Sequence, residues 1–270
     1  MQLPSPDHAI VTFVGSDALT FLQSQLTNDV AALAVGNWQW QGYCSAKGRL
    51  QATFALARTG AEAFAAVVHS SVAATLVKRL AMFRMRAKLA IELTASLVPT
   101  LHLTQPETAP KPLATIDLGH DRWMTVASRA DASVDPAQVQ LGALGNSHAF
   151  MQRWNSLGIE AMQPEITAAT AEMFVPQMIN WDHVQPGGGV SFSKGCYPGQ
   201  EVVARAHYRG AVKRGLSQQT IIASTPPELG AQATTKSGIV GEVCNIAPSH
   251  PAKGEFAALI VAQISARTIN

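Results

Sequence analysis

One segment in the C-terminal half of the chain combines the residue types that thiol chemistry requires. It reads Lys194-Gly-Cys-Tyr-Pro-Gly-Gln-Glu201. Pro198 suits the first position of a helix, where its missing N–H has no partner to lose. Cys196 stands just before that point, and the amides and dipole of a helix N-terminus favour a thiolate. The sequence therefore predicts a functional thiol at Cys196, with the ammonium group of Lys194 as its polariser.

Positive charge accumulates around this segment and suits an anionic ligand. Between residues 190 and 214 the only acid is Glu201, against five fixed cations: Lys194, Arg205, Arg209, Lys213 and Arg214. A carboxylate tail, a phosphate group or an RNA backbone would each fit such a cluster. Two simpler interpretations stay open. A basic run is often only a solvated surface, and a single cysteine is often buried filler.

Composition limits the classes of protein to which the chain can belong. Hydrophobic residues make up 47% and charged residues 14% of the sequence, which excludes a disordered chain. The net charge of +2 gives no overall field for nucleic acid. No apolar run reaches the roughly 18 residues of a membrane span, and the N-terminus has no secretory pattern. We therefore expect a cytoplasmic protein.

Cysteine spacing predicts neither a disulfide framework nor a metal centre. The three cysteines, Cys44, Cys196 and Cys244, are far apart, and none lies in a Cys-x-x-Cys pair. Three scattered thiols cannot hold a stable four-thiolate cluster. No stably bound metal is predicted.

The elements that must position these residues follow from hydrophobic periodicity. Past residue 215, short β runs broken by glycine and proline predict a small C-terminal β-barrel. The chain thus reads as α+β in residues 1–211, in two subdomains with a proline-rich joint near 99–112, followed by a barrel in 212–270. The clearest earlier elements are strands at 9–14, 51–57, 63–68 and 85–93, and helices at 71–83, 146–157 and from Pro198 onward.

Several motifs together are similar to those of the YgfZ family. The segment Lys194–Glu201, followed by Val-Ala-Arg205 and Arg209-Gly-x-x-Lys-Arg214, resembles the family's long signature. Other blocks that match the family are Phe21–Val30, Tyr43–Arg49, Phe174–Asn180 and, more loosely, Arg79–Lys88. The resemblance runs over essentially the whole chain.

The resemblance implies a fold, a ligand and a role. The family is related to the T-protein of glycine cleavage, an aminomethyltransferase. This relationship implies a ring of α+β subdomains around a central channel, with a small C-terminal β-barrel, and tetrahydrofolate or a one-carbon derivative as ligand. It also implies an accessory role in iron–sulfur protein maturation or repair and, through it, in tRNA modification. Iron–sulfur client or assembly proteins are the implied partners.

The resemblance also assigns ligand contacts. Trp154 and Glu160 match the segment in which the family carries a stacking aromatic and a carboxylate for the pterin. Further folate-binding candidates are Tyr197, Gln200, Arg205 and Arg209, of which the two arginines could instead hold an acidic partner surface. Trp154 could equally be a core residue, and Glu160 a surface carboxylate. Two local departures are Met162, which replaces the family's usual glycine, and His8, near a position where relatives carry an aromatic residue.

Two alternative functions carry less support from the sequence. A one-carbon transferase would need the acid that related enzymes carry after the glycine-rich turn, but no Asp or Glu follows Gly48 until Glu62. Direct tRNA binding through the cations of 78–88 and 194–214 is weakened by the near-neutral total charge and by the lack of a nucleic-acid module. The prediction is an accessory protein without aminomethyltransferase activity and without direct nucleic-acid binding.

Overall fold

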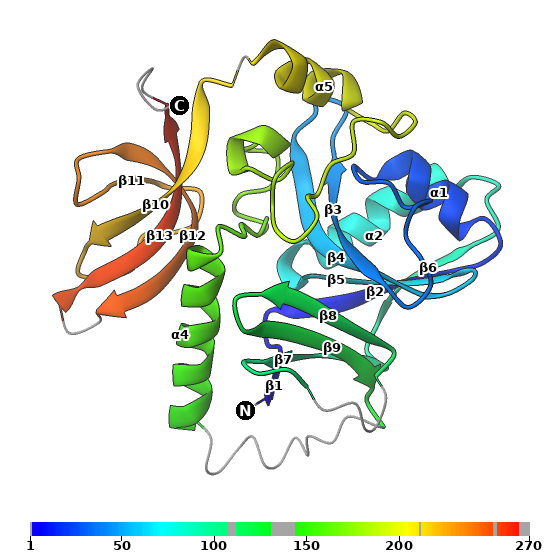
Figure 1. The fold of residues 1–270 in the computed structure, drawn as a ribbon, viewed down its shortest axis with the longest axis horizontal. Helices are drawn as coiled ribbons and strands as arrows, with labels where there is room; N and C mark the ends of the chain where they lie inside the picture. Colours follow the sequence, from blue (N-terminus) through cyan, green and yellow to red (C-terminus); the bar gives the residue numbers. More distant parts are fainter. Residues whose placement is uncertain (1, 107–111, 131–143, 211, 251–252, 265–270) are drawn as a thin grey trace.

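The computed structural model describes residues 2–106, 112–130, 144–210, 212–250 and 253–264 of the chain. They form helices and antiparallel sheets, in agreement with the predicted mixed class (Figure 1). No helix within these ranges is long and apolar enough to cross a membrane. The helices are α1 (Ala18–Gln25), α2 (Ser70–Arg84), α4 (Leu144–Glu160), the 3-10 turn η1 (Pro176–Ile179) and α5 (Gln200–Arg209). The strands are β1 (Gln2–Pro4), β2 (His8–Val14), β3 (Trp38–Cys44), β4 (Leu50–Gly60), β5 (Ala63–His69), β6 (Ala90–Thr94), β7 (Leu97–His102), β8 (Ala114–Gly119), β9 (Arg122–Ser128), β10 (Arg214–Ile222), β11 (Gln232–Thr234), β12 (Val240–His250) and β13 (Glu255–Gln263).

The largest sheet has five strands in the order β3-β4-β5-β2-β6. Helices α1 and α2 cover one of its faces. On α2, Val72, Leu76 and Leu80 recur about once per turn and are buried, which is the stripe of an amphipathic helix. The opposite face packs against the second sheet. Because both faces are covered, β4 is buried at every position from Leu50 to Ala57 and does not alternate.

The second sheet has the strand order β1-β7-β9-β8. Alternate residues of β8 from Ala114 to Leu118 are buried, as expected of a strand with one covered face. The predicted joint near 99–112 falls in this region. Residues 99–102 belong to β7, whereas 107–111 lie outside the described residues.

The C-terminal sheet has the order β10-β13-β12-β11 and curls into a half-barrel, at the place where the sequence predicts a small β-barrel. Its hydrogen-bonded ladder ends at β10 on one side and at β11 on the other. The turn after β11 nevertheless returns to the first strand, where the Lys236 amide donates to the Thr220 carbonyl at 2.7 Å. Strands β11 and β10 are thus linked only through this turn. Strand β11 has only three residues, too few to form a ladder with β10 as well as with β12.

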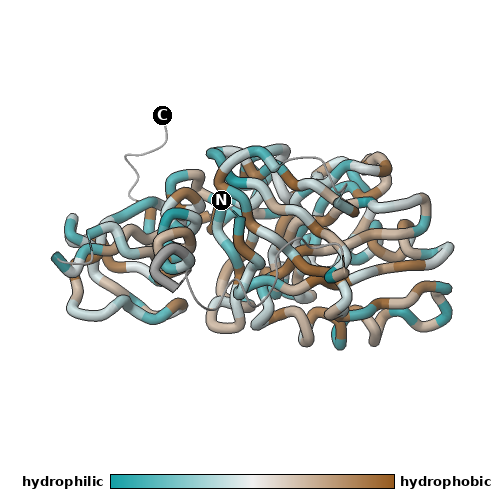
Figure 2. The backbone as a smooth tube through the Cα atoms, turned by 90° about the horizontal axis from the view of Figure 1, so that it is seen from below, coloured by the Kyte–Doolittle hydropathy of each residue, from teal (hydrophilic) through white to brown (hydrophobic). Residues whose placement is uncertain are grey.

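Helix α4 stands between the C-terminal sheet and the other two sheets (Figure 1). Figure 2 shows the same division from below, with the C-terminal sheet on the left and hydrophobic segments running through the larger part. Phe150 and Trp154 of α4 belong to the same buried cluster as Ile116 of β8 and Leu259 of β13. The helix therefore belongs to a buried cluster that includes residues of all three sheets.

Two predicted element boundaries are wrong. The strand predicted for 85–93 forms only from Ala90, because Met85 ends α2 in a positive-φ conformation and the chain must first turn onto the sheet. Helix α5 begins at Gln200, two residues after Pro198. Gly199 precedes it with φ of +81°, and its α-carbon lies so close to the turn at 45–48 that a Cβ would meet Ser45 O at 2.3 Å.

Candidate functional site

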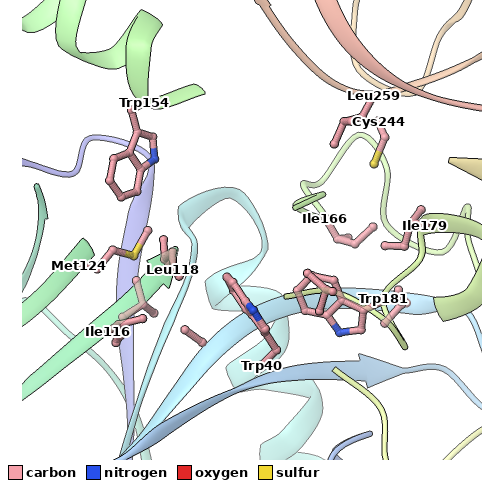
Figure 3. Close-up of a cluster of buried hydrophobic side chains, with 14 of the residues drawn as sticks. Trp40, Ile116, Leu118, Met124, Trp154, Ile166, Ile179, Trp181, Cys244 and Leu259 are labelled. Carbon is pink, nitrogen blue, oxygen red and sulfur yellow. The ribbon is translucent and has the colours of Figure 1, made fainter. Parts of the chain in front are cut away.

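A cavity of about 280 Å³ lies where α4, β4, β9 and β12 converge. Three tryptophans contribute to its walls: Trp40 of β3, Trp154 of α4, and Trp181 after η1. Figure 3 shows Trp154 extending from the helix toward Met124, with Trp40 and Trp181 beside each other across the cluster. The rings of Trp40 and Trp181 meet edge to face at a centroid distance of 5.3 Å. Flat, apolar walls of this kind suit a planar ring system.

Trp154 meets both interpretations that its sequence position allows. Its side chain is only 3% exposed and stacks on Phe150, one turn earlier on α4, at 6.4 Å between ring centroids. It is therefore a core residue. It also lines the cavity, where the Arg122 guanidinium lies 5.0 Å from its ring centroid. A ligand in the cavity would contact a ring that is already held rigidly.

Arg122, the first residue of β9, brings a buried cation to the cavity wall. Its Nη2 donates to Gln163 Oε1, and the Gln163 amide donates in turn to the carbonyls of Leu118 and Gln185, at 2.6 Å each. Burial lowers the pKa of Arg122 to about 10, an effect opposed by the negative charge of Glu165. Among the described residues, the buried Nε of Arg122 has no hydrogen-bond partner. An unmade hydrogen bond of this kind costs about 1–3 kcal/mol.

Glu165 and His8 form an ion pair at the same cavity. His8 Nε2 lies 2.8 Å from Glu165 Oε1, and Ser5 Oγ lies 2.6 Å from His8 Nδ1. Burial alone would raise the pKa of Glu165, but the charge and hydrogen bond of His8 outweigh burial and lower it. Burial likewise opposes protonation of His8, and Glu165 raises the His8 pKa. Each partner therefore favours the charged form of the other.

The structure does not bring Glu160 into this cavity. Its side chain is 48% exposed and pairs with Arg153 Nη1 at 3.4 Å on the surface of α4. Two residues later Met162 adopts a φ of +53°, the left-handed conformation that glycine adopts without strain. The chain turns at Met162, so that Gln163 and Glu165 face inward. Glu165 is not among the residues that the sequence predicts for the site, although a residue in place of an expected glycine just after a helix is a signal of this turn.

Cys196 lies on a different part of the molecule, in the segment that leads into α5 (Figure 1). Its side chain is exposed, whereas Cys44 and Cys244 are buried, and burial raises the pKa of each of those two thiols to about 12. Lys194 is buried, and its Nζ donates to the carbonyls of Gln23 and Leu26 at the end of α1. Burial lowers its pKa to about 8. The hydrogen bonds of this ammonium group thus go to α1, and its effect on Cys196 stays a prediction.

The remaining predicted contacts also gather near α5. Tyr197 is buried beneath Lys194, whose Nζ lies 5.2 Å from the ring centroid, and burial raises the Tyr197 pKa. Gln200 opens α5, and Arg205 and Arg209 are exposed along it. None of these four lines the described cavity. The structure therefore places the predicted residues at three positions: Trp154 at the cavity, Glu160 on the surface of α4, and residues 194–209 around α5.

The region after Gly48, where the resemblance predicts an acid for a one-carbon transferase, holds no Asp or Glu before Glu62. Gln51 is buried, and its amide donates to Glu172 Oε1, which also lies 3.4 Å from Arg79 Nη2. The carboxylate that Gln51 contacts thus comes from a distant part of the sequence and is already shared by two partners. A free general acid or base is not provided at this turn by the described residues.

Comparison with known proteins gives the chain clear relatives. It is 33% identical over 244 residues to the "tRNA-modifying protein YgfZ" of Photorhabdus laumondii, covering 83% of this chain and 72% of that protein. Proteins of the same name from Shigella sonnei and Escherichia coli are 32% identical over 253 residues, covering 86% of this chain and 75% of theirs. No family model matches. Among solved structures, the glycine cleavage system aminomethyltransferase T of Bartonella henselae superposes with a TM-score of 0.66 at 12% identity, over 97% of this chain and 78% of that one, which shows a shared fold.

Proposed function

The chain belongs to the YgfZ family, and from this premise we propose that it binds tetrahydrofolate or a one-carbon derivative in the cavity beside Trp154. Tetrahydrofolate, when bound, would carry one-carbon units into the molecule. We propose further that the protein is an accessory factor in iron–sulfur protein maturation or repair. Through iron–sulfur enzymes it would then support tRNA modification, the activity for which its relatives are named.

The observation that carries the proposal is the composition of the cavity wall. It presents a flat aromatic ring at Trp154, the buried guanidinium group of Arg122 and an ionised carboxylate at Glu165. A pterin has matching parts, namely a planar face, a ring carbonyl and an amino-substituted edge. The volume of about 280 Å³ lies near the lower end of ordinary ligand sites, roughly 300–1,000 Å³. This size suits a bicyclic head group, with the glutamate tail extending toward the cavity mouth.

The alternative of a one-carbon transferase has less support. At the turn after Gly48 the structure offers Gln51 and a shared Glu172 in place of a free acid. Without that acid, proton transfer to or from a one-carbon acceptor has no assigned group. The accessory role instead assigns the exposed thiol of Cys196 to transient contact with an iron–sulfur client, because the other two thiols are buried.

Anaerobic titration with tetrahydrofolate tests the proposal, with tryptophan fluorescence and calorimetry as readouts. We expect saturable binding with quenching in the wild type, and a smaller fluorescence change in Trp154→Phe. Trp123→Phe is the matched control, because Trp123 lies on β9 outside the cavity lining. Absence of binding heat and of quenching in the wild type would remove the folate proposal.

A second experiment addresses the accessory role. In cells that lack the natural protein, Cys196→Ser should fail to restore the activity of iron–sulfur enzymes, while the purified variant keeps its affinity for tetrahydrofolate. Cys44→Ala serves as control for the loss of a buried thiol. Full complementation by Cys196→Ser would contradict the role assigned to the thiol.

A further inference from the structure

The C-terminal end of α2 carries large apolar side chains in solvent. Met82 is 61% exposed, Phe83 52% and Met85 88%, and every residue of the segment 81–86, the α2 tip, is exposed. None of the three apolar residues lines the cavity. Figure 1 shows β6, the strand that follows the α2 tip, on the side of the molecule opposite α4 and the C-terminal sheet. An exposed apolar patch rimmed by polar residues marks a contact surface, and this one is separate from the proposed folate site.

Met85 holds its side chain in solvent at a conformational cost. The Ala87 amide donates to the Arg84 carbonyl at 2.8 Å, which closes a β-turn with Met85 as its second residue. Its φ of +43° and ψ of −105° lie near the type II′ values of about +60° and −120°, which favour glycine at this position. Because the Met85 side chain is exposed, packing within the fold does little to offset this strain. A strained residue that the fold does not use is a candidate for a contact with another surface.

Positive charge surrounds the α2 tip. The sequence from residue 63 to residue 91 holds no acid and five cations: Lys78, Arg79, Arg84, Arg86 and Lys88. Arg79 pairs with Glu172, whereas none of the other four forms an ion pair within the described part of the chain. Asp17 reaches this segment, but its carboxylate accepts from the Lys88 main-chain amide at 2.6 Å. The cations next to the exposed apolar side chains are therefore available to an anionic partner.

The arrangement of the α2 tip favours a fluid surface over a shaped groove. Met82 and Phe83 are adjacent in the last turn of α2, so they point about 100° apart around the helix axis. A groove that binds a helix reads a single stripe, at spacings of three and four residues. A nucleic acid would leave the methionines without a partner, because single strands are bound through stacking and backbone charge. A bilayer interface accepts apolar side chains in any direction, and anionic headgroups match the flanking cations.

We propose that the α2 tip binds the surface of an anionic lipid bilayer. Met82, Phe83 and Met85 insert at the boundary between headgroups and acyl chains, and Arg84 and Arg86 contact the lipid phosphates. Such a contact is peripheral and requires no membrane-spanning helix, and its strength comes from apolar burial and charge acting together. It goes beyond the proposed function, since the cavity takes no part in it.

Co-sedimentation of the full chain with lipid vesicles tests the proposal. We expect binding to vesicles of equal parts phosphatidylglycerol and phosphatidylcholine, and much weaker binding to phosphatidylcholine alone. Arg84→Gln combined with Arg86→Gln should weaken binding to the anionic vesicles roughly 25-fold, since each basic residue near such a surface contributes about fivefold. The matched control is Arg205→Gln combined with Arg209→Gln, which removes the same charge from α5. It should change binding by less than about twofold, because charge outside the contact is screened by salt.

Apolar variants separate a role in binding from a role in folding. Met85→Gly should weaken vesicle binding about tenfold through the lost apolar burial, yet thermal unfolding should show no loss of stability, because glycine adopts this turn without strain. Phe83→Ser should also weaken binding at least about tenfold. The control is Ile222→Ser, because Ile222 on β10 is 55% exposed, much like Phe83, but lies on the C-terminal sheet. This control should bind anionic vesicles as the wild type does.

Three results would overturn the proposal. If the wild type stays in the supernatant with the anionic vesicles, the α2 tip does not bind lipid, and its partner is a protein. If the arginine variants on α5 and at the tip lose binding equally, the attraction is one of overall charge and not of this surface. If Phe83→Ser and Met85→Gly both bind as the wild type does, the apolar side chains do not insert. None of these results depends on whether the protein binds folate.

Discussion

The ion pair of His8 and Glu165 makes a stability contribution with two pH limits. The Glu165 pKa is lowered in the folded protein, so its contribution is present above the ordinary value of 4.5 and is lost as pH falls through the lowered value. The His8 pKa is raised, so its contribution is complete below 6.5 and is lost as pH rises through the raised value. The pair should therefore stabilise the fold most between about pH 4.5 and 6.5.

Glu165→Gln should remove this contribution. We expect a loss of about 1–3 kcal/mol of unfolding free energy within that window, because a buried imidazolium would lose its counter-charge. The difference from the wild type should shrink on both sides of the window. Chemical denaturation at a series of pH values measures it, with Glu160→Gln as the exposed control. A constant difference from about pH 3 to 9 would contradict the ionised pair.

Single residues also show where sequence reasoning stops. The segment that contains Trp154 and Glu160 is identifiable from its motif, and Trp154 does reach the cavity. Which carboxylate turns inward depends on the turn at Met162, and the replacement of an expected glycine signals this turn without giving its direction. His8 and Glu165 are 157 positions apart, so that only the fold brings them together.

Among the elements, the start of α5 packs closely against the turn at 45–48, and this contact holds the segment that contains Cys196. Gly199 and Gly48 both have positive φ, and a Cβ on Gly199 would lie 2.7 Å from the Gly48 α-carbon. This contact packs the two glycine-containing motifs, remote in sequence, directly against each other. It also fixes the start of α5, which the position of Pro198 alone did not reveal.

Gly199→Ala should therefore destabilise the protein by about 2–4 kcal/mol, because it combines left-handed strain with a backbone clash. Gly195→Ala is the matched control in the same segment: a Cβ at this position would meet nothing within 4 Å, and its φ is not positive. We expect the control to change stability by less than about 0.5 kcal/mol. Thermal unfolding of both variants measures the difference. Equal stability of the two would mean that α5 is not packed on this turn.

At the scale of the whole molecule, the long amphipathic elements could be predicted from the sequence. The extent to which the C-terminal sheet closes into a barrel could not. Helix α2 and strands β2, β4 and β5 follow from hydrophobic spacing, since each covers or forms the large sheet. The sequence predicts a small β-barrel at the C-terminus, and the structure has a half-barrel there, in which β11 has only three residues. The ring around a central channel stays a prediction, and the described feature at this position is the cavity.

The cavity is lined by parts of the chain that are remote in sequence. A ligand bound there should therefore stabilise several elements of the fold at once. Its lining comes from His8 on β2, Arg122 on β9, Trp154 on α4 and Asn245 on β12. A ligand that binds only the folded state adds about 2.7 kcal/mol of stability at about 100 times its dissociation constant. Amides that exchange only through global unfolding should then exchange roughly 100-fold more slowly.

Hydrogen exchange with and without tetrahydrofolate measures this effect. We expect added protection in α4, in β9 and in β12 together, because one ligand would contact all three. The control is p-aminobenzoylglutamate, the folate tail without its pterin, which should give no protection at the cavity walls. Protection confined to α5 and residues 190–199 would instead locate the folate at the basic segment, and would separate the ligand from the cavity that Trp154 and Glu165 form.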